Sequence, residues 1–398
     1  MKTPLLFLCH RIPYPPNKGD KIRSFHVLKF LAERYRIFLA AFIDDPVDWA
    51  QKEKLHAWCE ESFFQGLNPT WARVRSLSGF ITGKPLTLPY YHDPNMASWI
   101  DRTMEREKIR HVLVYSSAMA QYTIGPRFDG TKRVIDFVDV DSDKWRQYAA
   151  KKQWPISWIY KWEARQLLAF ERSMAEMFDT SSFVSKEEAA LFCKLAPESA
   201  EKVNYFANGV DLENFNPDRE YTNPYPEGGR QIAFTGAMDY WPNEDAVTWF
   251  AEEVLPELRN KWPGTAFYIV GSRPTDKVLK LGSLPGVTVT GSVPDVRPYV
   301  AHATVIVAPM RIARGIQNKV LEAMSMAKSV VVTSMGLEGI NASNGRELLV
   351  ADTVSEFVDS ISKLFSGEMK GIGDRARQKV CMEFSWNATL PKLGQWLE

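Results

Sequence analysis

The sequence feature that most constrains the fold is a strand–loop–helix–strand pattern at residues 304–332. Residues 304–308 and 330–332 are short apolar runs of the kind that form buried strands, and Pro309 ends the first run. Between them, residues 315–327 form a predicted helix with one apolar face. Two buried strands joined by a helix are typical of a parallel sheet, so this segment predicts an α/β domain. The helix positions expected to be buried are Val320, Leu321, Ala323, Met324 and Ala327.

The start of this predicted helix carries candidate ligand contacts. Ligands of open α/β sheets bind at the carboxyl ends of the strands, and a helix N-terminus attracts phosphate. Gly315 would let the backbone approach such a ligand closely. Lys319 and Glu322 share one helix face, roughly 4.5 Å apart along the axis. We predict that Lys319 binds a diphosphate and that Glu322 accepts hydrogen bonds from a ribose; the alternative is a surface ion pair.

The same alternation of apolar runs and helices extends along the chain and predicts two domains. The predicted strands are residues 4–10, 36–42, 111–117, 134–140, 231–236, 265–271, 286–291, 304–309, 329–334 and 346–352, with a further short strand within 179–184. Residues 46–62 are predicted to be helical. A polar linker at residues 213–229 separates an N-terminal Rossmann-like domain, 1–212, from a second one, 230–380. Residues 381–398 form a helical tail.

Composition limits the class of protein. A length of 398 residues favours two domains, and a net charge of +1 argues against a dedicated nucleic-acid binder. The apolar run at residues 5–9 is too short for a signal peptide or a membrane span, so we expect a cytoplasmic protein. No metal site is expected, because the cysteines lack metal-binding spacing; they are Cys9, Cys59, Cys193 and Cys381.

The loops that follow the predicted strands define the expected ligand side. In the second domain they are residues 235–239, 271–273, 291–293 and 309–315, which include Gly236 and Arg273. In the first domain, Gly19 lies in a loop at the start of a helix, with Asp20 as a candidate cap. Lys18, Lys21 and Arg23 surround Gly19. They either attract an anion or are solvated bases around an ordinary turn.

Two segments of the first domain leave alternatives open. Asp136, Asp139, Asp141 and Asp143 either bind a metal in a DxD site or, as we favour, cap a helix or meet an acceptor. Residues 145–178 are helical, basic and rich in tryptophan. This segment either packs on the sheet with its bases extended to solvent, as we favour, or lies on a membrane surface.

Four segments together resemble a known family. They are CHRIPYPPNKGDKIRSFHVLKFL at residues 9–31, FANGVDLENFNP at 206–217, FTGAMDYWPNEDAV at 234–247 and GSVPDVRPYVAHATVIVAPMRIARGIQNKVLEAM at 291–324. Their order and spacing resemble the family 4 glycosyltransferases of GT-B fold. The similarity is greatest to a branch of sugar transferases associated with exopolysaccharide and PEP-CTERM sorting loci.

The resemblance implies two Rossmann-like domains facing a cleft, with the last helix crossing back to the first domain. It implies a retaining hexosyltransferase that needs no metal or other cofactor and uses a UDP- or GDP-sugar donor. Glu322 would bind the ribose and Lys319 the diphosphate. Backbone groups at Gly315 and Ile316 would assist with the phosphates, the backbone near Val293 would meet the base, and Gly19 would approach the donor phosphate or the acceptor.

The sequence departs from the family pattern at one expected site residue. Family members often carry a glutamate eight residues before the ribose-binding one, and here that position is Arg314. We therefore expect Arg314 or Arg311 to bind phosphate, so the candidate catalytic residues are Lys319, Glu322 and Arg314.

The expected reaction is sugar transfer to a glycan or lipid-linked oligosaccharide in exopolysaccharide biosynthesis. The protein would be cytoplasmic, and residues 145–178 could hold it peripherally on the inner membrane surface. The alternatives are a sugar-nucleotide epimerase of the same architecture and a non-catalytic nucleotide-sugar-binding protein.

Overall fold

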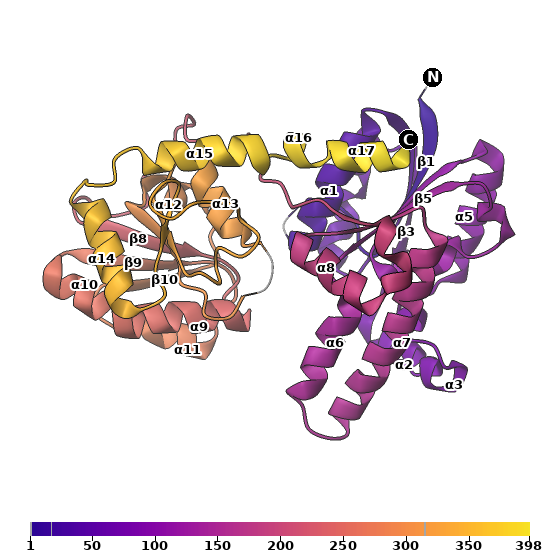
Figure 1. Ribbon diagram of the computed structural model, residues 1–398, viewed down its shortest axis with the longest axis horizontal. Helices are drawn as coiled ribbons and strands as arrows, with labels where there is room; N and C mark the ends of the chain where they lie inside the picture. The colour runs from indigo at the N-terminus through magenta and orange to yellow at the C-terminus, as the bar shows by residue number, and fades with distance from the viewer. Residues whose placement is uncertain (1, 17, 314–315) are drawn as a thin grey trace. The chain divides into compact units, whose positions relative to one another are not determined.

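The computed structural model describes residues 2–16, 18–313 and 316–398, and the chain divides into two compact units (Figure 1). Unit 1 comprises Met1–Ala207 and Leu390–Glu398, and unit 2 comprises Asn208–Thr389. Each unit is a parallel sheet covered by helices, so the predicted α/β class with two Rossmann-like domains is confirmed. Among the residues that the structure describes, no helix is both long and apolar enough to cross a bilayer.

The described sheet of unit 1 has seven parallel strands in the order β3-β2-β1-β4-β5-β6-β7. The strands are β1 Thr3–Cys9, β2 Tyr35–Ile43, β3 Glu61–Gly66, β4 His111–Tyr115, β5 Lys132–Val138, β6 Thr180–Phe183 and β7 Val203–Tyr205. Both faces of this sheet are covered, so its inner strands are apolar along their length: the last five residues of β1 are all buried. The order reverses between β1 and β4, which is the switch point where ligands of such sheets bind.

The helices of unit 1 pack on both faces of its sheet. They are α1 Gly19–Ala32, η1 Pro46–Ala57, α2 Pro69–Ser76, α3 Ser78–Thr82, α4 Thr87–Tyr90, α5 Pro94–Glu107, η2 Ser117–Thr123, η3 Pro126–Phe128, α6 Asp141–Ala150, α7 Ile156–Met177, α8 Lys186–Leu195, η4 Pro197–Lys202 and α17 Pro391–Leu397. α8 begins where a serine can cap it: the Ser185 side chain accepts a hydrogen bond from the Glu188 N–H.

The helix predicted at residues 46–62 is wrong in its second part. The helical segment is a 3-10 helix that ends at Ala57, and Glu61–Gly66 form the edge strand β3. Each residue of β3 lies opposite one of β2, from Glu61 beside Phe38 to Gly66 beside Ile43. Pairing with β2 makes these residues a strand, and nothing in their local sequence indicates that pairing.

The described sheet of unit 2 has six parallel strands in the order β10-β9-β8-β11-β12-β13. They are β8 Arg230–Thr235, β9 Thr265–Val270, β10 Val287–Gly291, β11 Val305–Ala308, β12 Val330–Val332 and β13 Leu349–Val350. The helices are α9 Trp241–Trp249, η5 Phe250–Val254, α10 Leu255–Lys261, α11 Asp276–Leu281, α12 Arg297–His302, α13 Asn318–Ser325, α14 Val354–Phe365, α15 Ile372–Glu383 and α16 Trp386–Thr389. Here the order reverses between β8 and β11.

The helix predicted from Gly315 to Ala327 is shorter in the structure. α13 spans Asn318–Ser325, and Gly315 lies outside the described residues. Val320, Leu321, Ala323 and Met324 are buried as predicted, but Ala327 is only partly buried and has a left-handed backbone with φ 54°. A Cβ at Gly373 of α15 would lie 2.0 Å from the Ala327 carbonyl oxygen. α15 therefore passes directly beneath the end of α13 and prevents its continuation.

The end of the chain belongs to unit 1. Leu393 and Leu397 of α17 are fully buried, and the Trp396 ring lies 6.0 Å from the Phe206 ring. The segment before it belongs to unit 2, where Ser385 pairs with Val210. The chain therefore passes from one unit to the other twice.

Candidate functional site

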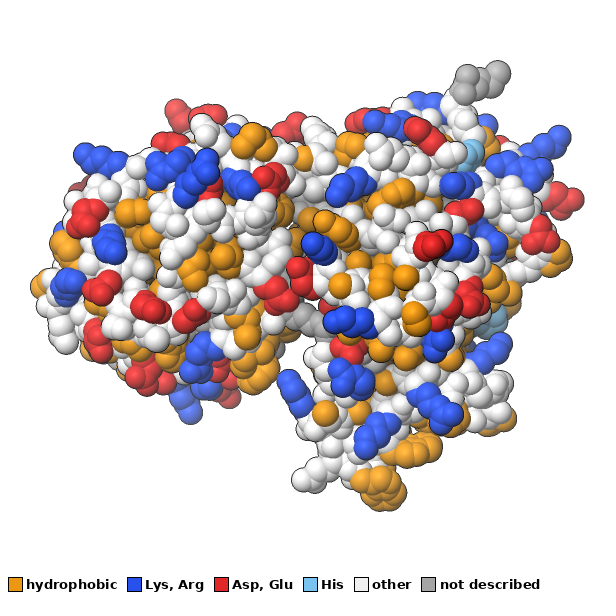
Figure 2. Space-filling view, viewed as in Figure 1, with side chains coloured by type: hydrophobic (Ala, Val, Ile, Leu, Met, Phe, Trp, Pro, Cys, Tyr) orange, Lys and Arg blue, Asp and Glu red, His pale blue; other side chains and the backbone are white. Residues whose placement is uncertain are grey.

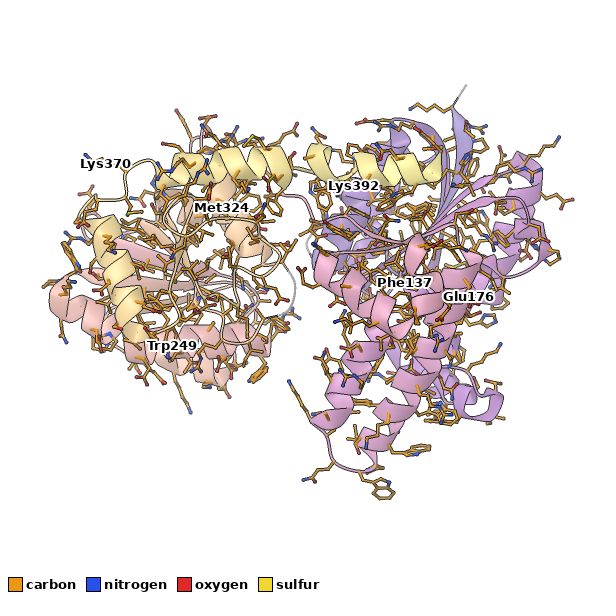
Figure 3. The ribbon with its side chains drawn as sticks, viewed as in Figure 1. Phe137, Glu176, Trp249, Met324, Lys370 and Lys392 are labelled. Carbon is orange, nitrogen blue, oxygen red and sulfur yellow. The ribbon has the colours of Figure 1, made fainter. Side chains whose placement is uncertain are left out.

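The residues predicted to bind a nucleotide lie where the strand order of unit 2 reverses. Thr235 ends β8 and Gly236 follows it, and Met310 comes after β11, the neighbouring strand on the other side of the switch point. α13 comes after β11 and carries Lys319 and Glu322 on one face, with Met324 (labelled in Figure 3) on its buried face. This is the position at which doubly wound sheets bind ligands.

Lys319 lies in largely apolar surroundings. Its Nζ donates a hydrogen bond of 2.6 Å to Oδ1 of Asn243 and lies 4.5 Å from the centre of the Phe234 ring. The Met310 sulfur is 3.8 Å away. Burial disfavours the ammonium form and lowers the pKa of Lys319 to about 7, although Glu322 acts in the opposite direction. An anionic ligand would therefore stabilise the Lys319 ammonium more than it would stabilise the ammonium of a solvated lysine.

Glu322 is the second ionisable group of this face, and Lys319 balances its charge only in part. Burial raises the pKa of its carboxyl to about 7, and Lys319 only partly offsets this rise. In the described part of the chain, no side chain or backbone group donates a hydrogen bond to its carboxylate. Perturbed titratable groups in such positions are typical of functional sites. Lys319 and Glu322 are thus brought together at the switch point, as the sequence predicts.

Asn243 is a site residue that sequence reasoning missed. It does not cap a helix, because α9 begins at Trp241 after Tyr240. The buried Asn243 amide instead donates to the Ala237 carbonyl at 2.9 Å and accepts from Lys319. It therefore fixes the Lys319 ammonium against the loop that follows β8. The Pro-Asn-Glu-Asp run resembles a helix start, so only the position of Lys319, 76 residues away, distinguishes the two roles.

The backbone at Gly236 lies close to Asn243 and to Gly271. A Cβ at Gly236 would lie 2.7 Å from Nδ2 of Asn243, and a Cβ at Gly271 would lie 1.7 Å from the Gly236 carbonyl oxygen. Gly271 also has a φ of 157°, which side chains rarely allow. The loops after β8 and β9 therefore pack without side chains beside the Lys319–Asn243 contact.

The other predicted donor contacts are dispersed or already paired. Arg311 forms a two-hydrogen-bond pair with Asp245 of α9, at 2.6 and 3.0 Å, and its guanidinium lies 5.6 Å from the Trp249 ring (labelled in Figure 3). Arg273 is mostly exposed and lies 3.1 Å from Asp239. Val293 and Ile316 are partly buried loop residues. Arg314 and Gly315 lie outside the described residues.

Two of the three basic residues around Gly19 in unit 1, Lys21 and Arg23, are neither solvated nor available to an anion, whereas Lys18 is exposed. Nζ of Lys21 lies 2.9 Å from Asp48, and Nε of Arg23 lies 2.7 Å from Asp136; all four side chains are buried. Both interpretations offered for Lys21 are therefore wrong. Gly19 itself is the first residue of α1, and a Cβ there would meet no atom within 4 Å.

Unit 1 has a cavity of about 220 Å³ at its own switch point. His10 follows β1, Ser116 follows β4, and Phe137, labelled in Figure 3, lies near the end of β5. The His10 ring is stacked on Tyr115, with ring centres 5.7 Å apart and planes 5° apart. Tyr91 meets the His10 ring edge-on at 6.0 Å. The cavity therefore has aromatic walls and polar groups at the strand ends.

Charged pairs line the same cavity. Nε2 of His10 lies 3.4 Å from Asp20, and Arg11 lies 2.5 Å from the same carboxylate. Burial alone would raise the pKa of Asp20, but His10 and Arg11 outweigh it and hold that pKa below its usual range. Asp20 was predicted as a helix cap, and that prediction is wrong, since Lys18 is the residue before α1.

The aspartates after β5 are held by cations of the chain itself. Nζ of Lys144 lies 2.6 Å from Asp139 and 3.3 Å from Asp141, and all three residues line the cavity. Burial lowers the pKa of Lys144, but the two carboxylates outweigh it and raise that pKa. Asp143 pairs with Arg146 at 2.7 Å. Within residues 2–16, 18–313 and 316–398, no group of three His, Cys, Asp or Glu side chains is placed to hold a metal ion.

Two residues of the cavity wall have unusual backbone conformations. Ser116 has a φ of 78° and Val138 a φ of 70°, in the left-handed region that a β-branched residue rarely adopts. The Ser116 N–H donates to the Asp136 carbonyl, and the Val138 carbonyl accepts from Val184. Such strain is often found where the backbone serves a binding site.

Comparisons with known proteins bear on this arrangement. Residues 229–367 match the family model described as "Glycosyl transferases group 1". No curated protein matches the chain. Among solved structures, a glycosyltransferase from Rickettsia africae ESF-5 is 16% identical with a TM-score of 0.70, and the match covers 99% of this chain and 98% of that one.

Two further structures match over a similar extent. Sucrose-phosphate synthase from Thermosynechococcus elongatus is 14% identical, with a TM-score of 0.69 and coverage of 99% and 98%. Anabaena Alr3699/HepE, in complex with UDP, is 14% identical, with a TM-score of 0.66 and coverage of 99% of each chain. The shared fold is that of GT-B glycosyltransferases, which confirms the predicted fold class.

Proposed function

We propose, from the premise that the chain is a glycosyltransferase with the GT-B fold, that it transfers a sugar from a UDP- or GDP-sugar to a glycan or lipid-linked oligosaccharide. We further propose that the transfer retains the anomeric configuration and serves exopolysaccharide biosynthesis in the branch that the sequence resembles. The observation that carries the proposal is the pair Lys319 and Glu322 at the switch point of unit 2, where each charge only partly offsets the cost of burying the other.

The donor end of the proposal rests on charge. Glycosidic cleavage leaves negative charge on the departing diphosphate, and a preformed cation stabilises that charge. Lys319 is held by Asn243 and lies among apolar groups, where its interaction with phosphate is strong. Glu322, one turn further along α13, would accept from the ribose hydroxyls. The Anabaena protein of similar fold has been solved with UDP and with UDP-glucose, which supports a nucleotide-sugar donor.

The acceptor end is assigned to the cavity of unit 1. A volume of about 220 Å³ suits one sugar residue. Its aromatic walls suit the apolar face of a sugar ring, and the charged pairs of Lys144 with Asp139 and Asp141 offer donors and acceptors to hydroxyl groups. The protein would act at the cytoplasmic side of the membrane, which residues 145–178 contact peripherally.

One observation favours a second candidate function. A sugar-nucleotide epimerase of the same architecture needs acid–base groups near its substrate, and His10 with Asp20 supplies such a pair in the cavity. The products separate the two activities, because a transferase releases nucleoside diphosphate whereas an epimerase yields an isomerised nucleotide sugar. Binding of the nucleotide sugar without either product would indicate a non-catalytic protein.

The test uses the purified chain with a panel of UDP-, GDP- and ADP-sugars. A donor that binds the folded chain raises its melting temperature and identifies the base and sugar. Glu322→Gln should then weaken donor binding by about 10- to 100-fold, the loss of a hydrogen bond to a charged group. Lys319→Ala should reduce turnover by a similar factor without unfolding the chain.

The matched control is a helical Lys–Glu pair whose acid is exposed. Lys379 and Glu383 of α15 lie 2.7 Å apart, and Glu383→Gln should leave donor affinity unchanged. If Glu322→Gln behaves like Glu383→Gln, the ribose role is wrong and the pair on α13 is structural.

A further inference from the structure

Two segments of unit 1 are basic and contain no acidic residue. Residues 69–91 and 144–162 include no Asp or Glu, whereas the whole chain has 49 Lys and Arg against 48 Asp and Glu. The basic residues of the two segments are Arg73, Arg75, Lys84, Lys144, Arg146, Lys151, Lys152 and Lys161. The first segment forms α2, α3 and α4, and the second forms α6 from its fourth residue onward, the connection to α7 and the first part of α7.

The same segments expose large apolar side chains. Ile81 is 90% exposed, Trp154 is 81% exposed and Trp71 is 72% exposed. Further exposed apolar residues of the two segments are Val74, Leu77, Tyr148, Ile156 and Trp158. In Figure 2, hydrophobic and basic side chains gather together on the lower part of the α6–α7 hairpin. Isolated exposed apolar residues are common, but a group of this kind marks a binding surface.

Direct contacts join the two segments into one surface. The Phe80 ring of α3 is stacked on Trp158 of α7, with ring centres 5.4 Å apart and planes 15° apart. Trp162 lies 5.6 Å from the same ring. One turn further along α7, the buried Glu163 carboxylate accepts a hydrogen bond of 3.1 Å from the Thr87 N–H. The exposed residues therefore belong to one fixed platform, which we call the basic aromatic surface.

We propose that the basic aromatic surface binds the face of a bilayer that contains anionic lipids. Tryptophan rings favour the headgroup region, and each lysine or arginine near an anionic bilayer adds to the attraction. Interfaces between proteins are instead depleted of lysine. The surface holds Lys84, Lys151, Lys152 and Lys161 with no acidic residue among them, so its charge complements lipid phosphate.

This inference rests on the membrane contact included in the proposed function. It changes which residues make that contact. The later part of α7 packs inside unit 1, where Leu167 and Met174 are fully or almost fully buried. Residues 163–178 are therefore removed from the predicted contact segment of 145–178, and α2 and α3, which the sequence did not suggest, are added. Of the two alternatives for residues 145–178, the membrane alternative thus applies to the first part and the packing alternative to residues 163–178.

The test measures co-sedimentation of the purified chain with vesicles of phosphatidylcholine alone or mixed with phosphatidylglycerol. Binding should occur on the mixed vesicles, should be at least tenfold weaker on phosphatidylcholine alone, and should weaken as salt increases. Lys151→Glu with Lys152→Glu should weaken binding by tenfold or more, and so should Ile81→Ser with Trp154→Ser. The control is Lys363→Glu with Lys370→Glu, two exposed lysines of unit 2, which should leave binding unchanged.

Each outcome decides the proposal. Equal binding by the surface and control variants, or no binding to the mixed vesicles, would overturn it. If the wild-type chain self-associates without vesicles and the surface variants do not, the surface joins copies of the chain and the membrane proposal is wrong. Sugar transfer to a soluble acceptor is measured in parallel. Surface variants that keep transfer but lose vesicle binding separate this inference from the proposed reaction.

Discussion

At the scale of single residues, Lys319 and Glu322 are partly buried ionisable groups whose charges are only partly balanced by their neighbours. Polar groups inside proteins usually have partners, and groups without them generally have a functional reason. The hydrogen-bond partner of Lys319, Asn243, is neutral, and Glu322 balances the charge of Lys319 only in part. The site therefore loses stability in the free chain that a charged ligand would restore.

This arrangement predicts a pH dependence of donor binding. The pKa of Lys319 is about 7 in the free chain, and a bound diphosphate favours the protonated form, so binding above pH 7 requires uptake of a proton. Affinity for a nucleotide sugar should therefore fall by up to about tenfold per pH unit from pH 7 to 9. Below pH 7, protonation of Glu322 should weaken the ribose contact. Isothermal titration calorimetry at pH values on both sides of pH 7 measures both losses of affinity.

The control keeps the positive charge. Lys319→Arg remains cationic across the range, so its affinity should not fall between pH 7 and 9. A wild-type profile that is flat over the same interval would show that Lys319 does not contact the diphosphate.

The sequence identified the residues of this site more completely than their partners. Lys319 and Glu322 are adjacent on one helix, so their spacing alone places them together. Asn243 and Asp245 meet residues that lie 76 and 66 positions away in the sequence, and no local pattern records such contacts. The cavity residue His10 was not among the predicted site residues, because its neighbours Asp20 and Tyr115 come from separate elements.

At the scale of elements, the apolar runs predicted the strands well where both faces are covered. β1, β2, β4, β5, β8, β9 and β11 are buried along most of their length and were all expected. β3 was missed because an edge strand has one neighbour and an ordinary amphipathic sequence. α13 was predicted too long, since the position of α15 determines where it ends. Helix ends and edge strands thus depend on tertiary contacts that the local sequence does not contain.

The first turn of α1 provides a test of the predicted ligand approach at Gly19. A Cβ at Gly19 meets no atom within 4 Å, and its φ is not in the left-handed region. Gly19→Ala should therefore leave stability unchanged or raise it by a few tenths of a kcal/mol. If the backbone at Gly19 contacts a substrate, kcat/KM should fall by about tenfold or more.

Thermal unfolding and steady-state kinetics of the same samples give both values for Gly19→Ala. Lys18→Ala, at the exposed neighbouring position, is the control for changes in local charge. Unchanged kinetics in the Gly19 variant would remove Gly19 from the candidate site.

At the scale of the whole molecule, the two units share one plan. Each has strands in the order 3-2-1-4-5-6, numbered from its own first strand, with a seventh strand added at the end in unit 1. Each has its candidate site where that order reverses. In unit 1 the site is the cavity near His10, and in unit 2 it is the face of α13. The proposed reaction has two substrates, and each unit offers one candidate site at the equivalent topological position.

The return of the chain to unit 1 predicts a selective loss of stability. Leu397→Ala should destabilise unit 1 by about 2–5 kcal/mol, because a fully buried leucine is removed. Hydrogen exchange followed by mass spectrometry reads the two sheets separately. Amides of β1 should exchange faster in this variant, while those of β8 should not change. The control Leu279→Ala, at an exposed site of unit 2, should alter neither sheet, and equal acceleration of both sheets in Leu397→Ala would contradict the assignment of α17 to unit 1.

The order of these segments along the chain also has a consequence for biosynthesis. A ribosome makes Asn208–Thr389 before Leu390–Glu398, so the whole of unit 2 emerges while unit 1 still lacks α17. The apolar surface of unit 1 that Leu393 and Leu397 cover in the folded chain stays exposed during that interval. Exposed apolar surfaces of this kind are bound by chaperones. The unit whose synthesis begins first is thus the second to be completed.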